Sequence, residues 1–244
     1  MTRLFITSDM LSNNVLTLPK EVHHHVRRVL RAQPKDPLTL IKDGTHLLQT
    51  AIVEIESSSI TISIQEQLPI PKRTQPKVIL VQALPKQDKM SDILRACSEL
   101  GVDQFIPLIT ERVVRIMDDK KTLKNKTRWE SILWSAAMQA QSNTIPTIDE
   151  PRTLSELFAH PDIKSADLKL VPWEDEPTLL KGILSSQKKP ESIVILIGPE
   201  GGLSAKEVTT LTDNGFHSVS LGKTILRTEH AGLVTVAQVL YQFS

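Results

Sequence analysis

The chain has 244 residues, of which 40% are hydrophobic and 23% are charged, and its formal net charge is +1. This composition is typical of a soluble globular protein with one large core or two smaller ones. Because the charges nearly balance, any binding to nucleic acid must depend on local basic patches rather than on a field around the whole molecule. The single cysteine, Cys97, excludes an internal disulfide and suits a reducing cytoplasm.

Apolar runs are short throughout the chain. None reaches the length of a membrane span, and residues 1–9 contain no long apolar segment before polar residues return. We therefore expect neither export nor membrane insertion, and we expect a cytoplasmic location.

The first part of the chain is rich in β-branched residues. Three short, partly alternating runs predict strands at residues 38–41, 50–55 and 59–64. Asp43-Gly44 is typical of a tight turn between two of these strands. Residues 68–76 contain three prolines in a polar context, which indicates an extended linker. We predict a small β-rich domain at residues 1–70, a linker at 71–76 and a second domain at 77–244.

In the second domain, apolar strand-like runs alternate with longer amphipathic segments. Strands are predicted at residues 78–83, 105–109, 168–171, 193–197 and 218–221. Helices are predicted at residues 88–100, 128–141 and 228–243. Strands that alternate with helices indicate a mostly parallel sheet covered on both faces. Ligands of such sheets bind at the carboxyl ends of the strands.

A glycine-rich loop at residues 198–202 follows one of these strands, and Ser204 opens a capping box with Glu207 at the next helix. Its three glycines let the backbone approach a small molecule closely. Pro199 lacks an amide donor and Glu200 is negative, which argues against a bound phosphate. The loop therefore favours a neutral or cationic ligand, and S-adenosylmethionine fits this description. The alternative is an ordinary turn, because glycine and proline dominate turns.

A second loop, at residues 221–229, also follows a short strand and opens a helix. Two such loops at one edge of a sheet could hold both faces of a ligand. Together, Ile197-Gly198-Pro199-Glu200-Gly201-Gly202 and Leu221-Gly222-Lys223-Thr224-Ile225-Leu226-Arg227-Thr228-Glu229 resemble the C-terminal signature of the SPOUT methyltransferases that methylate N3 of a uridine in small-subunit ribosomal RNA. Further matches lie at His24 or His25 with residues 29–31, residues 99–102, Arg112, residues 128–129, Gln139 and Pro146.

The resemblance covers nearly the whole chain and implies a fold and a cofactor. The implied fold class is α/β, with an N-terminal PUA-like β-barrel that binds RNA and a C-terminal SPOUT domain with a trefoil knot. The implied enzyme is a homodimer that binds S-adenosylmethionine and no metal, and its substrate is 16S ribosomal RNA in the assembled small subunit. The residues expected at the cofactor are Val171, Trp173, Ile197, Gly198, Glu200, Gly201, Gly202, Leu221, Gly222, Ile225 and Leu226.

The resemblance also suggests catalytic and RNA-binding residues. A uracil N3–H must lose its proton before the nitrogen can attack, so we expect Arg227 to stabilise the anion at the uracil oxygens. Glu229 would orient Arg227 or accept a proton, and Arg112 would contribute across the dimer. The alternative is an Arg227–Glu229 pair that only fixes the loop. The residues expected to contact RNA phosphates are Arg3, His25, Arg27, Arg28 and Arg31, although charges on a short helix are often only a solvated face.

Some positions depart from the family pattern. Ser142 stands where the family usually has an arginine, Val113 where a serine is common, Ser135 where a glutamate is frequent and His230 where threonine is usual. The departures at Ser142, Val113 and His230 motivate an alternative function, a non-catalytic RNA-binding protein that retains the SPOUT fold.

Overall fold

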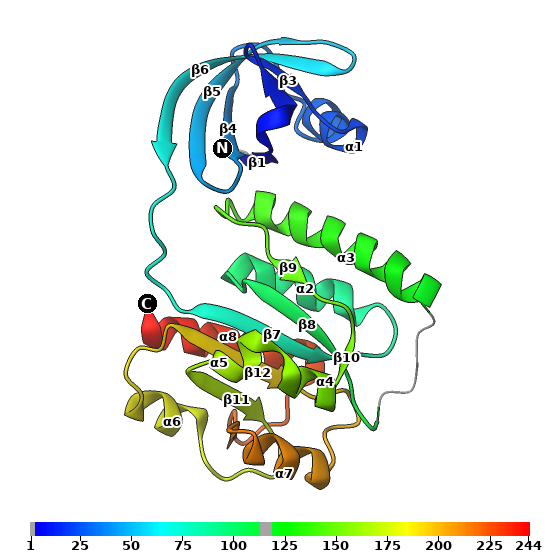
Figure 1. Ribbon diagram of the computed structural model, residues 1–244, viewed down its shortest axis with the longest axis vertical. Coiled ribbons are helices and arrows are strands. Elements are labelled where there is room, and N and C mark those ends of the chain that lie inside the picture. The colour runs from blue at the N-terminus through cyan, green and yellow to red at the C-terminus, as the bar shows by residue number, and fades with distance from the viewer. Residues whose placement is uncertain (1–2, 113–118) are drawn as a thin grey trace. The chain divides into compact units, whose positions relative to one another are not determined.

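The structure of the chain is a computed structural model that describes residues 3–112 and 119–244. It divides into two compact units (Figure 1). The first unit comprises the chain up to Lys72 together with Met138–Thr144, and the second comprises Arg73–Ala137 and Ile145–Ser244. The domain limits predicted from the sequence stay a prediction. Among the described residues, no helix is long and apolar enough to cross a membrane.

The first unit is built on a curled six-stranded sheet with the order β1-β4-β5-β6-β3-β2. Its strands are β1 (Arg3–Ile6), β2 (Leu11–Ser12), β3 (Val15–Thr17), β4 (Pro37–Lys42), β5 (His46–Ile55) and β6 (Ser59–Pro69). Strand β1 pairs parallel to β4, and the other pairs are antiparallel. The β4–β5 hairpin closes at the predicted Asp43-Gly44 turn, where Lys42 pairs with His46. Register shifts between β5 and β6 let the two long strands bend.

The core of the first unit comes from the inward-facing residues of these strands. Leu4, Leu16, Leu40 and Ile60 are each fully buried. A 3-10 turn (Ser8–Met10), helix α1 (Lys20–His24) and a π-helical turn (His25–Val29) complete the unit. This helical segment also buries Val26, whereas Arg27 and Arg28 are exposed.

The second unit is a seven-stranded sheet in which every described pairing is parallel, as the alternating pattern predicted. The path runs β10-β8-β7-β12-β11-β13, and β9 pairs with β8. Its strands are β7 (Lys77–Ala83), β8 (Gln104–Ile109), β9 (Thr147–Ile148), β10 (Arg152–Thr153), β11 (Leu168–Pro172), β12 (Ser192–Ile197) and β13 (His217–Val219). Its helices are α2 (Lys89–Leu100), α3 (Asp119–Gln139), α4 (Leu154–Ala159), α5 (Pro161–Ser165), α6 (Leu180–Ser186), α7 (Ala205–Asp213) and α8 (Thr228–Phe243).

Helices cover both faces of this sheet and create two cores. In β7, Val78 and Leu80 pack into one core with α2, α3, α6 and α8. The alternate residues Ile79 and Val81 pack into the other core with α4, α5 and α7. Both faces of β7 are therefore apolar, which explains its continuous hydrophobic run.

Helix α3 differs from its prediction. It begins at Asp119 rather than at residue 128, so the basic segment 120–128 is also helical. The reason is that lysine and leucine are good helix formers, and the segment extends a helix whose C-terminal half is anchored by Trp129 and Leu133 in the core.

Candidate active site

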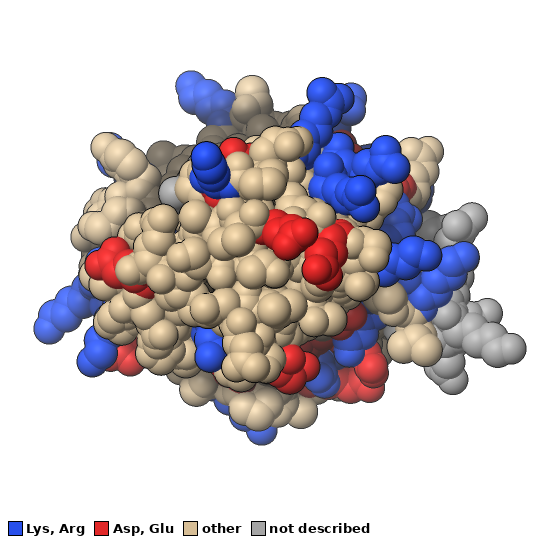
Figure 2. Space-filling model, turned by 90° about the horizontal axis from the view of Figure 1, so that it is seen from above, with Lys and Arg blue, Asp and Glu red and all other residues tan. Residues whose placement is uncertain are grey.

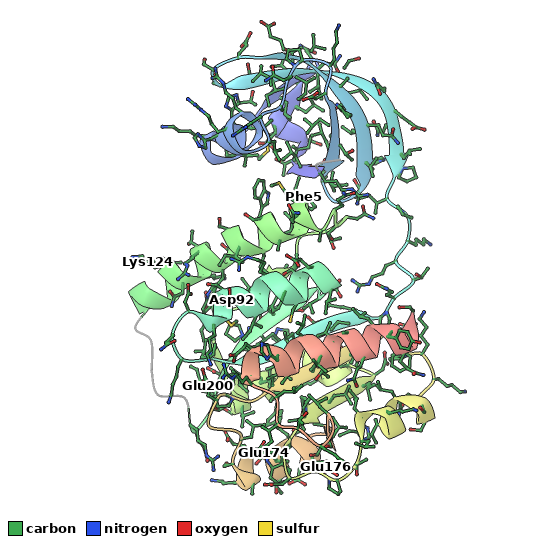
Figure 3. All side chains as sticks on the ribbon, turned by 180° about the vertical axis from the view of Figure 1, so that it is seen from behind. Phe5, Asp92, Lys124, Glu174, Glu176 and Glu200 are labelled. Atoms are coloured by element: carbon green, nitrogen blue, oxygen red, sulfur yellow. The ribbon has the colours of Figure 1, made fainter. Side chains whose placement is uncertain are left out.

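Both predicted loops leave the carboxyl edge of the parallel sheet. One connects β12 to α7, and the other connects β13 to α8. Between them lies a cavity of about 400 Å³. The residues that line it are Lys89, Pro172, Glu174, Ile197, Gly198, Pro199, Glu200, Gly202, Leu203, Ile225, Leu226, Arg227, Thr228 and Ala231. Figure 3 labels two of its acidic residues, Glu174 and Glu200.

Side chains at two glycines of the first loop would crowd neighbouring atoms. Gly202 has a φ of +69°, and a Cβ atom there would lie 2.7 Å from Oε1 of Glu174. A Cβ atom at Gly198 would lie 3.0 Å from Cγ of Leu203. The loop closes on itself because the Gly202 amide donates to the Pro199 carbonyl at 2.9 Å. The backbone itself therefore forms this wall of the cavity.

A buried chain of hydrogen bonds ties the first loop to α8 and to the sheet. The Thr228 hydroxyl donates to the Gly198 carbonyl at 2.6 Å. The same hydroxyl oxygen accepts from Nε2 of Gln82 at 3.0 Å. Nε2 of Gln82 also donates to the Ala83 carbonyl at 3.0 Å, so both of its amide hydrogens are used and the side-chain orientation is set.

A charged cluster ties the same two segments together at the cavity. Nζ of Lys89 lies 3.2 Å from Oε1 of Glu200 and 3.2 Å from Oε2 of Glu229. The Glu200 carboxylate also accepts from the Lys86 amide at 3.0 Å. Hydrogen bonds to Glu200 and then Glu229 raise the pKa of Lys89. The backbone amide of Glu229 and the Lys89 ammonium lower the pKa of the Glu229 carboxyl, so it stays ionised at neutral pH.

The structure places the predicted cofactor residues in two groups. Those that line the cavity are Ile197, Gly198, Glu200, Gly202, Ile225 and Leu226. The lining does not include Val171, Trp173, Gly201, Leu221 or Gly222. Val171 is fully buried in the core beneath α4, α5 and α7, and Trp173 packs against the same core. Leu221 packs against the opposite core. The assignment of these residues to the cofactor stays a prediction.

The predicted catalytic residues also lie apart from one another. Arg227 lines the cavity, is exposed and precedes the first turn of α8. Among the described residues Arg227 forms no ion pair, and Glu229 pairs with Lys89 instead. The alternative Arg227–Glu229 pair is therefore not found. Arg112 is not among the residues that line the cavity. Its guanidinium donates to the Gly201 carbonyl at 2.6 Å and so contacts the first loop.

The predicted RNA-binding residues belong to the first unit. Arg27, Arg28 and Arg31 are exposed, whereas the side chain of His25 lies outside the described residues. Arg3 donates to the Gln141 carbonyl and, at 2.6 Å, to Oδ1 of Asn143, so it is occupied in holding the segment 138–144. Figure 2 shows several Lys and Arg side chains gathered toward one side of the face that it presents. No group of three or more metal-ligating side chains that could hold an ion occurs in the described part of the chain.

Sequence reasoning missed several residues of the site. The most important are Lys89, Glu174, Thr228 and the buried Gln82. A signal for Lys89 existed, because the turn after β7 leaves the same sheet edge as the two glycine-bearing loops. No comparable pattern marked Gln82, which sits inside an apolar strand.

The fold and the cavity define an RNA methyltransferase of the α/β class, since residues 72–240 match the family model described as an RNA methyltransferase domain. The chain is 32% identical to a Synechocystis protein named ribosomal RNA small subunit methyltransferase E. The alignment has 245 positions and covers 97% of this chain and 76% of that protein. It is 30% identical to the Bacillus subtilis protein of the same name over 224 residues, which is 90% of this chain and 87% of that protein. The chain belongs to the ribosomal RNA small subunit methyltransferase E family.

Solved structures agree with this assignment. The Neisseria gonorrhoeae ribosomal RNA small subunit methyltransferase E, crystallised with S-adenosylmethionine, matches with a TM-score of 0.86 and 26% identity over 100% of this chain and 98% of its own. A Legionella pneumophila protein described as a methyltransferase, also with bound S-adenosylmethionine, matches with a TM-score of 0.86 and 27% identity over 98% and 96% of the two chains. The predicted family, two-domain fold class, enzyme class and cofactor are therefore confirmed. The trefoil knot is what the resemblance to the SPOUT methyltransferases implies.

Proposed function

We propose that this chain transfers a methyl group from S-adenosylmethionine to N3 of one uridine in 16S ribosomal RNA. The observation that carries the proposal is the cavity between the two loops, in a chain whose family acts on RNA of the small ribosomal subunit. The choice of N3 of a uridine rests on the resemblance of the paired loops to the SPOUT enzymes.

The residues of the cavity fit the cofactor. Ile197, Leu203 and Leu226 supply apolar walls for a nucleoside, while the cramped backbone at Gly198 and Gly202 offers main-chain groups at close range. The carboxylates of Glu174 and Glu200 tolerate a positive ligand. When bound, S-adenosylmethionine supplies a methyl group that its sulfonium already activates.

The protein must then favour an ionised uracil. Arg227 is a guanidinium at the cavity that forms no ion pair among the described residues, so it is available to the uracil oxygens. Glu229 is a weak base because its pKa is lowered, and its carboxylate is held by Lys89. Of its two predicted roles, fixing the loop is the one that this geometry supports.

The RNA contacts belong to the first unit in this proposal. Arg27, Arg28 and Arg31 are exposed and would neutralise phosphates, while RNA shape and an exposed uridine would determine the target. The assembled small subunit is the proposed substrate, as the resemblance implies, and the reaction belongs in the cytoplasm.

The working form in this proposal is a homodimer. Helix α8 supports it, because residues 231–244 contain no charged side chain and Tyr241 is 88% exposed. The exposed residues of this segment are uncharged, and the large exposed ring of Tyr241 would be stabilised if a second copy covered it. Arg112 would then act near the partner's substrate.

One variant tests the catalytic assignment. Arg227→Ala should bind S-adenosylmethionine in calorimetry with nearly unchanged affinity, yet lose methyl transfer by about 100-fold or more. Lys223→Ala is the matched control, because Lys223 is an exposed cation of the same loop outside the cavity lining. Full activity of Arg227→Ala would remove this residue from the mechanism.

The reaction itself is tested in cells. Mass spectrometry of 16S ribosomal RNA from cells with and without the gene should show the loss of one 3-methyluridine. The competing function is a non-catalytic RNA-binding protein, motivated by Ser142, His230 and by Val113, which lies outside the described residues. An unchanged RNA, together with no heat from S-adenosylmethionine in calorimetry, would favour that function.

A further inference from the structure

Lys89 occupies a position that neither the loop motifs nor the predicted site residues include. It lies at the start of α2, lines the cavity, and contacts a carboxylate from each of two distant segments. Glu200 belongs to the first loop, and Glu229 belongs to the first turn of α8. The Lys89 side chain is 29% exposed, and those of Glu200 and Glu229 are 22% and 17% exposed. The cluster is therefore shielded from solvent more than an ordinary surface ion pair.

Two different links join the first loop to α8. The Gln82–Thr228–Gly198 chain is neutral and buried, and it fixes the distance between the backbones. Lys89 forms the second link, which is charged and lies at the cavity. Because a neutral link already exists, mechanical attachment alone does not explain a lysine at this place.

The charges around the cavity explain it better. In the part of the chain that the structure describes, four charged side chains line the cavity, namely Lys89, Arg227, Glu174 and Glu200. Among the described residues, Lys89 is the cation that pairs with both Glu200 and Glu229. Removal of Lys89 would leave these two carboxylates without an ion-pair partner, and the potential in the cavity would become more negative.

We propose that Lys89 is a positioning residue that also sets how strongly the cavity prefers a positively charged methyl donor over its neutral product. This inference rests on the proposed use of the cavity for S-adenosylmethionine. The donor carries one more positive charge than S-adenosylhomocysteine, so the two ligands report the potential of the cavity directly. Lys89 restrains the preference for the donor, and it holds the two carboxylates in place.

The decisive measurement is the ratio of the dissociation constants for S-adenosylhomocysteine and S-adenosylmethionine, obtained by calorimetry on the full chain. Lys89→Met should raise this ratio about fivefold, since a nearby cation opposes the sulfonium. Lys89→Arg should restore a ratio close to that of the unchanged protein. Glu229→Gln should lower the ratio, because it removes a negative charge and frees Lys89. The changes should shrink as ionic strength rises.

Two control variants separate charge from attachment. Thr228→Val breaks the neutral link without altering any charge, so it should weaken both ligands by the same factor and leave the ratio unchanged. Arg95→Met removes a cation from the exposed part of α2, where Arg95 pairs with Asp92, and should leave both affinities unchanged. Thermal unfolding checks that each variant is folded.

The outcomes are distinguishable. If the unsubstituted protein binds both ligands and Lys89→Met raises both dissociation constants by the same factor, Lys89 only stabilises the loop and the inference is wrong. If the unchanged protein binds neither ligand, the proposed function fails before this inference is reached.

Discussion

Single residues of the first loop are constrained by space as much as by chemistry. Gly202 combines a left-handed backbone with the close approach of Glu174. We expect Gly202→Ala to cost about 1 kcal/mol for the backbone alone, and to weaken S-adenosylmethionine by about tenfold because Glu174 must move. Calorimetry and urea unfolding would measure the two effects.

Gly182→Ala is the matched control for this change. Gly182 lies within helix α6, where a Cβ atom would meet nothing within 4 Å. Alanine is the better helix former, so this variant should gain about 0.5–1 kcal/mol of stability and bind the cofactor normally. Equal affinity in both variants would show that the first loop tolerates a side chain at Gly202.

Cys97 lies on α2 in the core of the second unit. It is fully buried in the core beneath α2, α3 and α8, and burial raises the pKa of its thiol to about 12. The reactive thiolate is therefore scarce at pH 8. A disulfide reagent such as Ellman's should detect no thiol in the native protein at this pH, and one thiol per chain in guanidinium chloride. Rapid reaction of the native protein would contradict this burial.

For single residues, the sequence indicated which side chains lie at the ligand better than it indicated their ion-pair partners. Glu200 was predicted as an acidic residue at the ligand, and it does line the cavity. Its partner Lys89 was not predicted, because the pair joins segments that are far apart in the chain and each residue alone resembles a surface charge. Glu229 was expected to orient Arg227 or to accept a proton, but its carboxylate pairs with Lys89.

Among the elements, two helices begin with complete capping boxes. Ser204 and Glu207 cap α7, and Thr153 and Glu156 cap α4. Ser204→Ala and Thr153→Ala should each lower stability by about 1 kcal/mol in urea unfolding. Only Ser204→Ala should also weaken S-adenosylmethionine, because the first loop ends at this cap.

The physical basis of that difference is the environment of Glu207. This carboxylate is buried, and besides the Ser204 amide it accepts from the Glu111 amide at 2.9 Å. The α7 cap therefore fixes two segments at once, whereas neither residue of the α4 cap lines the cavity. Equal cofactor affinity in the two variants would mean that the first loop is held by other contacts.

Helices and strands with a long hydrophobic pattern were predictable from the sequence, and very short ones were not. Strands β7, β8, β11 and β12 are buried on both faces and appear in the sequence as apolar runs, so they were predicted within a few residues. Strands β9 and β10 have two residues each, which is too short for any periodicity. The short helices α4, α5 and α6 were missed for the same reason.

For the whole molecule, the parallel sheet with two covered faces was predictable, but its order was not. Neighbouring strands such as β7 and β12 come from distant parts of the chain, and no local pattern encodes that choice. The first unit also includes a segment from the middle of the chain. The segment Met138–Thr144 begins in the last residues of α3 yet belongs to the first unit, where Arg3 holds it through Gln141 and Asn143.

The proposed homodimer supplies the prediction at this scale. Tyr241 is the most exposed large apolar side chain of α8, and an aspartate there would place a charge in a face that otherwise has none. Because an unpaired charge is costly to bury, Tyr241→Asp should convert the dimer to a monomer at micromolar concentration, as measured by analytical ultracentrifugation. Activity should fall with it, since Arg112 would no longer reach the partner's substrate.

Val53→Asp provides the comparison for this variant. Val53 is 53% exposed on β5 of the first unit, so the substitution adds the same charge at another exposed apolar residue. It should leave the sedimentation coefficient unchanged, because β5 lies outside the proposed interface. If Tyr241→Asp also remains a dimer, the exposed face of α8 is not where two copies meet, and Arg112 must then act within its own chain, where it already contacts the first loop at Gly201.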